Sequence, residues 1–213
     1  MLSRLLGLSL LGLSVATGRA QAPPSAADLA KQLQAHYSTV RDFTADFTHT
    51  YRGGAMKQTF SERGDVRVKK PRRMYWTYTA PEKKEFISDG TRVYSYIKAD
   101  RVVYVSDMPG GNEGSTAVSF LAGEGDLTKD FKASVPAVQP DGVWQLDLLP
   151  KTSQPDFVSL RLVVDRKSLA LRGLTSVDQQ AGTSTFTFAR LRENVGLADN
   201  QFAFKIPKGV EVR

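Results

Sequence analysis

The chain has 213 residues, of which 41% are hydrophobic and 24% are charged, and it contains no cysteine. This is the composition of one ordinary globular domain, and it excludes disulfide bonds and thiol chemistry. The 29 Lys and Arg exceed the 22 Asp and Glu by seven, which suits nucleic acid, an anionic membrane surface or an acidic protein partner without choosing among them.

The amino terminus has the pattern of a cleaved signal peptide over residues 1–20. Arg4 supplies the positive charge, residues 5–15 form an apolar run, and small residues follow. The run is too short to span a bilayer as a helix, so a membrane anchor is less favoured. Cleavage after Ala20 would remove Arg4 and Arg19 and leave one mature domain, residues 21–213, with 27 basic and 22 acidic residues. Export argues against nucleic acid as a partner, because the basic residues form no tail.

A helix is predicted to follow the proline-rich junction. Ser25 and Asp28 have the spacing of an N-cap and its acidic partner. Apolar residues then recur at helical spacing and predict a single apolar stripe, formed by Leu29, Leu33, Tyr37 and Val40.

From Phe43 the hydrophobic period changes to two, which predicts a strand up to Tyr51. Short strands bounded by Gly, Pro or Asp are predicted over residues 57–63, 65–70, 73–79, 85–89, 91–98 and 101–106. A loop follows at residues 107–115, then one or two helical turns over residues 116–131, and then strands at 143–149, 156–165, 169–178 and 182–192. These elements predict a mainly β (α+β) fold, a strongly curved or barrel-like antiparallel sheet covered by an amino-terminal helix and a mid-chain helical insert.

The sequence offers few groups for catalysis. His36 and His49 are the two imidazoles, and the spacings of zinc proteases, serine hydrolases and phosphate-binding loops do not occur. The carboxylates are scattered, which favours solvated charges, although a carboxylate pair assembled by the fold stays open. No metal and no other cofactor is predicted.

The segment KKPRRMYWTYTAP, residues 69–81, joins a basic collar to an aromatic run. Strand alternation places Met74, Trp76 and Tyr78 on one face. That face is interpreted either as ordinary core, which the pattern alone favours, or as the wall of a cavity that takes acyl chains.

Five segments in this order make the chain resemble the LolA family of periplasmic lipoprotein carriers over essentially the whole mature chain. They are VRDFTADFTHT, VKKPRRMYWTYTAP, FISDGTRVYSY, VSFLAGEGDLTKDF and NQFAFKIPKGVEV. The resemblance implies a half-open antiparallel β-barrel whose concave face is covered by helices and holds the lipid of an outer-membrane lipoprotein. It implies a monomer in the periplasm, loaded by an inner-membrane LolCDE-type ABC transporter and unloaded by a LolB-type outer-membrane receptor.

The resemblance also implies two groups of site residues. The lipid cavity is expected to be lined by Leu33, Tyr37, Phe47, Met74, Trp76, Tyr78, Phe86, Phe120 and Leu121. Where the family commonly has Arg before Pro to latch a lid, this chain has Lys70. The latch is then expected to be weaker, or the adjacent Arg72 or Arg73 to share that role. Two alternatives remain, a periplasmic lipid-binding sensor on a similar barrel and a hydrolase acting on lipid or glycan.

Overall fold

The computed structural model describes residues 24–53, 58–108, 121, 123 and 125–213. Within them, one α-helix precedes a single sheet of twelve strands, and a short 3-10 helix, η2 (Asp199–Phe202), lies near the carboxyl end. The elements are α1 (Ala26–Thr39), β1 (Asp42–Arg52), β2 (Thr59–Lys69), β3 (Arg73–Ala80), β4 (Lys84–Asp89), β5 (Arg92–Ile97), β6 (Val102–Asp107), β7 (Phe131–Ser134), β8 (Val143–Pro150), β9 (Ser159–Asp165), β10 (Leu171–Val177), β11 (Thr183–Glu193) and β12 (Glu211–Val212).

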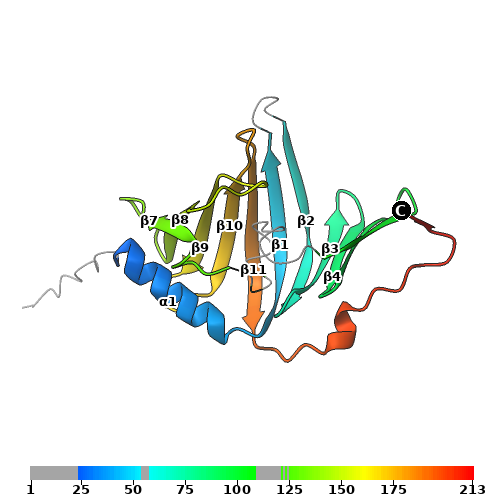
Figure 1. The fold of residues 1–213 in the computed structure, drawn as a ribbon, viewed down its shortest axis with the longest axis horizontal. Coiled ribbons are helices and arrows are strands. Elements are labelled where there is room, and N and C mark those ends of the chain that lie inside the picture. Colours follow the sequence, from blue (N-terminus) through cyan, green and yellow to red (C-terminus); the bar gives the residue numbers. More distant parts are fainter. Residues whose placement is uncertain (1–23, 54–57, 109–120, 122, 124) are drawn as a thin grey trace, which may run out of the picture.

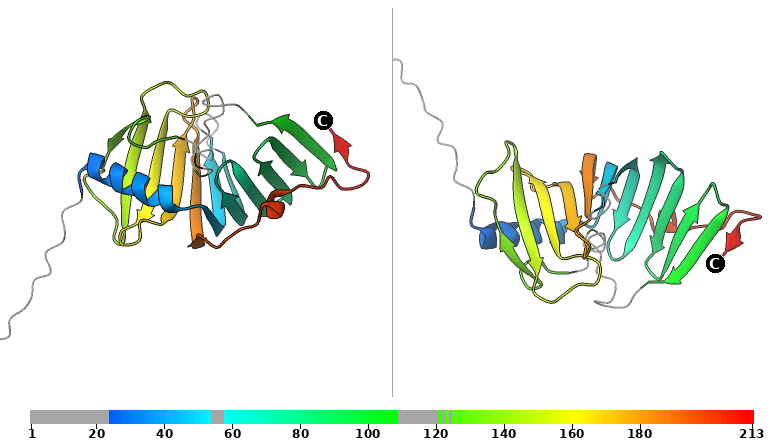
Figure 2. Two further views of the ribbon diagram at one scale, coloured as in Figure 1. Left: turned by 60° about the horizontal axis from the view of Figure 1, so that its bottom comes forward. Right: turned by 90° about the horizontal axis from the view of Figure 1, so that it is seen from above.

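The sheet is open and strongly twisted. Its strand order is β12-β6-β5-β4-β3-β2-β1-β11-β10-β9-β8-β7, so β12 and β7 form the two edges (Figure 1). All neighbours are antiparallel except β12, which pairs in parallel with β6. The two halves of the sheet turn toward each other on either side of β1 and β11 (Figure 2). The predicted fold, a mainly β, half-open barrel with an amino-terminal helix, is confirmed.

Helix α1 begins where the sequence predicts. The Ser25 hydroxyl accepts a hydrogen bond from the Asp28 amide at 3.1 Å, which satisfies one of the free amides of the first turn and stabilises the helix by about 1 kcal/mol. Its apolar stripe is buried through Leu29 and Leu33, and the helix packs across β7 and β8 (Figure 2).

Two local predictions differ from the structure. Gly64 was expected to separate two strands, but β2 runs through it without a break. A side chain there would place its Cβ 1.8 Å from the Thr77 carbonyl oxygen, so the glycine permits the close approach of β3 and does not end the strand. The predicted helical turns over residues 116–131 lie largely outside the described residues, and Phe131 begins strand β7.

After β11 the chain is tied back to the start of β1 by Asp42. Its buried carboxylate accepts hydrogen bonds from the amides of Val195, Gly196 and Leu197 at 2.7 to 3.2 Å. A buried carboxylate that accepts several backbone amides avoids the cost of an unpaired charge. The carboxyl-terminal segment is thereby directed toward η2, which contacts β3 and β4.

Candidate functional site

The site is the inner face of the sheet, which we define as the face that bears Phe43, Ala45 and Phe47 and packs against α1. Strand register continues this face into the neighbouring strands. Ala45 pairs with Val66 on β2, and Val66 pairs with Trp76 on β3. Successive apolar rows therefore cross several strands side by side, as period-two alternation in each strand requires.

Aromatic rings form the centre of the inner face. The Phe47 ring lies edge-on to the rings of Trp76 and Tyr78, with centroids 5.0 Å apart in both pairs. Gly64, which pairs with both Phe47 and Tyr78, leaves room for these rings. Trp76 also packs on Phe186 of β11 at 5.2 Å. Such contacts add about 0.5–1.5 kcal/mol each to the burial of the rings.

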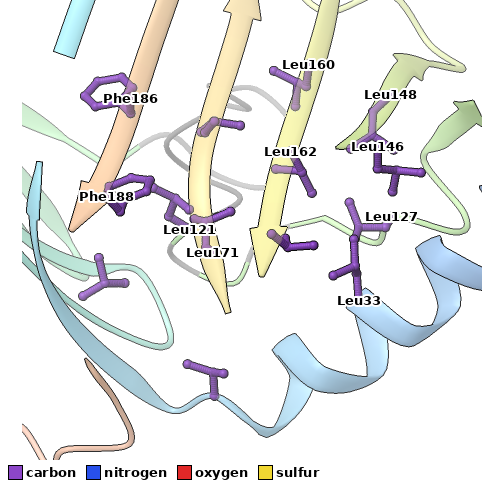
Figure 3. Packing of buried hydrophobic residues seen from close by; sticks show 14 of the residues in the cluster. Leu33, Leu121, Leu127, Leu146, Leu148, Leu160, Leu162, Leu171, Phe186 and Phe188 are labelled. Atoms are coloured by element: carbon purple, nitrogen blue, oxygen red, sulfur yellow. The ribbon is translucent and has the colours of Figure 1, made fainter. Parts of the chain in front are cut away.

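Phe186 and Phe188 of β11 complete this cluster and were absent from the residues expected in the site. Their rings are stacked at 6.4 Å, and Figure 3 shows Phe188 beside Leu121 and Leu171. The alternation of Thr and Phe over residues 185–188 was the signal that could have found them.

The inner face is covered by the described part of the lid segment, which we define as Leu121, Gly123 and residues 125–130. Leu121 and Leu127 are buried in the same hydrophobic cluster as the sheet residues. Leu127 packs beside Leu33 of α1 (Figure 3), and its amide donates to the Gln34 side-chain oxygen at 2.9 Å. The lid segment thus touches both the sheet and the helix.

In this closed form the wall expected to bind lipid is packed like a core. Met74 and Trp76 are each 2% exposed. The Trp76 indole nitrogen is buried without a hydrogen-bond partner among the described residues, an arrangement that costs about 1–3 kcal/mol.

Lys70 lies at the junction of β2, the helix and the lid segment. Its ammonium donates to the Tyr37 carbonyl and sits 3.3 Å from the centroid of the Tyr37 ring. The Tyr37 carbonyl belongs to the last turn of α1, where it also accepts the Val40 amide at 3.2 Å. Burial lowers the pKa of Lys70 to about 8, so the group remains mostly charged at neutral pH.

Tyr37 links Lys70 and helix α1 to the lid segment. Its hydroxyl donates to the Leu121 carbonyl, and burial raises the pKa of this hydroxyl far above its usual range. Gly123 has φ +89°, and a Cβ there would lie 2.8 Å from Lys70 Cδ. The lid backbone therefore rests directly on the lysine side chain. We call Lys70, Tyr37, Leu121 and Gly123 the latch.

The remaining expected site residues are placed as follows. Tyr78 and Phe86 are half-buried at the margin of the hydrophobic cluster, and Phe120 lies outside the described residues. Arg73 lies 3.6 Å from the Asp199 carboxylate of η2, where Lys69 binds the same carboxylate at 2.5 Å. The structure therefore brings Lys70 to the lid segment and Arg73 to the carboxyl-terminal segment.

Glu62 on the inner face pairs with His49 and Lys84 and not with another acid. Among the described residues, no three His, Cys, Asp or Glu side chains gather as metal ligands. No helix in the described part of the chain is long and apolar enough to cross a membrane.

Comparisons of the sequence and of the structure with known proteins found several similar proteins. Residues 38–205 match the family described as outer membrane lipoprotein carrier protein LolA. Proteins named outer-membrane lipoprotein carrier protein from Cupriavidus taiwanensis and Chromobacterium violaceum are 30% and 28% identical, each over 90% of both chains. Among solved structures, an uncharacterized conserved protein from Thermus thermophilus has a TM-score of 0.54 at 12% identity, covering 87% of this chain and 96% of its own. A LolA superfamily protein from Nitrosomonas europaea has a TM-score of 0.47 at 9% identity, covering 85% and 99%.

Proposed function

The chain belongs to the outer membrane lipoprotein carrier protein LolA family, and we propose that it carries the acyl chains of lipoproteins across the periplasm. After removal of residues 1–20, the mature monomer would receive its cargo from a LolCDE-type ABC transporter in the inner membrane. It would deliver the cargo to a LolB-type receptor in the outer membrane. It would act as a binding protein and not as an enzyme.

The observation that supports this proposal best is an apolar sheet face closed by a small latch. Each methylene transferred from water contributes about 0.8 kcal/mol, so exposing a chain of about sixteen carbons costs on the order of 12 kcal/mol. A carrier must therefore replace the bilayer. The ring cluster around Phe47 and Trp76 supplies an apolar surface of the required kind.

Loading on this face exchanges one apolar contact for another. In the closed form Leu121 and Leu127 cover the inner face, and burying each contributes about 1.5–3 kcal/mol. An acyl chain that displaced them would restore similar contacts to the sheet. The balance between closed and loaded forms is then set largely by the few polar contacts of the latch, which suits a carrier that must also release its cargo.

A disulfide across the latch provides the test. The Cβ that a side chain at Gly123 would have lies 2.9 Å from Lys70 Cγ, so Cβ atoms at the two positions come within about 4.4 Å of each other, a separation that permits a disulfide. The natural chain has no cysteine, so Lys70→Cys/Gly123→Cys would form one defined bond. The reduced protein should take up a synthetic triacylated lipopeptide and pass it to the receptor, whereas the oxidised protein should not.

The reduced form of the same sample is the control, because it contains the same two cysteines, including any backbone strain from a cysteine at position 123, but lacks the disulfide. Equal uptake by the oxidised and reduced forms would contradict the proposed lid. Tight uptake without transfer to any LolB-type receptor would instead favour a lipid-binding sensor.

A further inference from the structure

The inner face changes from apolar to polar toward the far ends of the strands, away from α1. Phe47 on β1 is followed two residues later by His49, and register places Glu62 of β2 and Phe186 of β11 on either side of His49. Ser184 precedes Phe186 on the same face of β11. The apolar wall therefore ends in a row of polar groups.

These groups form one hydrogen-bonded set, which we call the rim cluster: His49, Glu62, Lys84 and Ser184. The two ring nitrogens of His49 lie 3.2 Å from the Glu62 carboxylate and 2.8 Å from the Ser184 hydroxyl. Lys84 pairs with the other Glu62 oxygen at 2.6 Å. The imidazole stacks on Phe186, with centroids 4.2 Å apart, so the rim cluster directly adjoins the apolar wall.

The rim cluster is partly open to solvent and has little net charge. The side chains of His49 and Glu62 are 17% and 19% exposed. Burial lowers the pKa of His49, which keeps the imidazole neutral at neutral pH, and the charges of Glu62 and Lys84 offset each other. The Lys84 ammonium keeps donors for uncharged carbonyl groups, while the paired Glu62 carboxylate removes the net positive charge that would favour anionic phosphate.

The order serine, histidine, glutamate also has the hydrogen-bond spacing of a nucleophilic triad. Ser184, however, lies on an interior strand and pairs with Tyr51 of β1 on one side and Ser176 of β10 on the other. The surrounding backbone amides are therefore occupied in the sheet, and the described residues provide no evident pair of donors for an oxyanion. The geometry supports binding better than catalysis.

The length of the apolar stretch matches that of an acyl chain. His49 comes six positions after Phe43 on β1, roughly 20 Å at a strand rise of about 3.3 Å per residue. A sixteen-carbon chain extends for roughly the same length, given C–C bonds of about 1.5 Å. A chain lying along β1 with its methyl end near Phe43 would place its carbonyl end at the rim cluster.

We propose that the rim cluster is a subsite for the uncharged ester and amide linkages of an acylglyceryl group, the polar end of the acylated ligand. This inference rests on the proposed carrier function and adds the part of the ligand that the apolar wall does not recognise. Lys84 donates to the ligand carbonyls. The Ser184 hydroxyl donates to Nε2 of the neutral His49 ring and holds it in place, and Glu62 orients His49 and balances the charge of Lys84.

The test compares three probes on the same variants. The probes are a dipalmitoylglyceryl lipopeptide with an uncharged peptide, the hydrocarbon diphenylhexatriene, and phosphatidylglycerol. Lys84→Met should weaken lipopeptide binding about three- to tenfold, the effect of losing one hydrogen bond, and should leave diphenylhexatriene binding unchanged. Glu62→Gln should strengthen binding of phosphatidylglycerol relative to the lipopeptide. Lys83→Met is the matched control, because Lys83 is exposed and lies just before β4, outside the rim cluster.

Each other outcome overturns the inference. Unchanged lipopeptide binding in Lys84→Met, or an equal loss for the lipopeptide and diphenylhexatriene, removes the rim cluster as a linkage subsite. Release of palmitate by the unaltered protein but not by Ser184→Ala replaces binding with catalysis. Failure of the unaltered protein to bind the lipopeptide at all refutes the carrier function itself, a result distinct from failure of the subsite alone.

Discussion

Replacing Tyr37 with phenylalanine isolates the polar contact between helix α1 and the lid segment. The substitution keeps the ring that Lys70 contacts and removes the hydroxyl that donates to the Leu121 carbonyl. Because Leu121 is fully buried, its carbonyl would be left without this donor at a cost of about 1–3 kcal/mol. At about 1.4 kcal/mol per tenfold change, the ratio of closed to open lid should fall about 5- to 150-fold.

Hydrogen exchange at the Leu127 amide reports this change, because that amide is bonded to Gln34 across the closed lid. Tyr37→Phe should speed its exchange by the same factor and should also speed uptake of a fluorescent fatty acid. Tyr94→Phe is the control, because the Tyr94 hydroxyl bonds Asp89 at 3.3 Å on another part of the sheet. Unchanged Leu127 exchange in Tyr37→Phe would show that the Tyr37 hydroxyl does not hold the lid.

Three further predictions concern charge at buried positions. Since the pKa of Lys70 is about 8 in the closed form and 10.5 in the ordinary exposed group, closing releases a proton between these values. Raising the pH from 8 to 10.5 should therefore strengthen closure of the lid segment, measured as reduced acrylamide quenching of tryptophan fluorescence. Lys70→Met should abolish this pH dependence. Opening of the lid segment at high pH would contradict the assigned sign. Met74→Glu should lower the free energy of unfolding, measured by urea titration, by several kcal/mol. Leu149→Glu, at an exposed site, is the control and should have little effect. A decrease below about 1 kcal/mol in Met74→Glu would mean that the inner face is hydrated. Asp42→Asn should lower Tm by about 2–10 °C, because an amide cannot replace both acceptor oxygens for the backbone amides of residues 195–197. An unchanged Tm would show that these hydrogen bonds do not stabilise the fold.

The elements that the sequence predicted correctly depend on neighbours along the chain. Ser25 and Asp28 are three residues apart, and their bond defines the start of α1 whatever the rest of the chain does. Alternation likewise places Met74, Trp76 and Tyr78 on one face of β3. Local geometry was sufficient for these predictions.

The errors and omissions concern partners that are distant in sequence. Gly64 was predicted to mark a strand boundary, but it lies within β2 and is packed against the Thr77 carbonyl. Arg73 belongs to the basic collar expected to hold the lid, yet its partner Asp199 comes from the carboxyl-terminal segment. Phe186 joins the aromatic cluster only because β11 pairs with β1.

The sequence by itself determined the helix start, most strand positions and the aromatic face, because caps and side-chain alternation act within a few residues. The tertiary structure decided the latch and the rim cluster. Tyr37 is 33 residues from Lys70 and 84 residues from Leu121, while His49 and Ser184 are 135 residues apart. Hydrogen bonds act over about 3 Å, so such pairs exist only after strand order and the packing of the helix have fixed which distant segments meet.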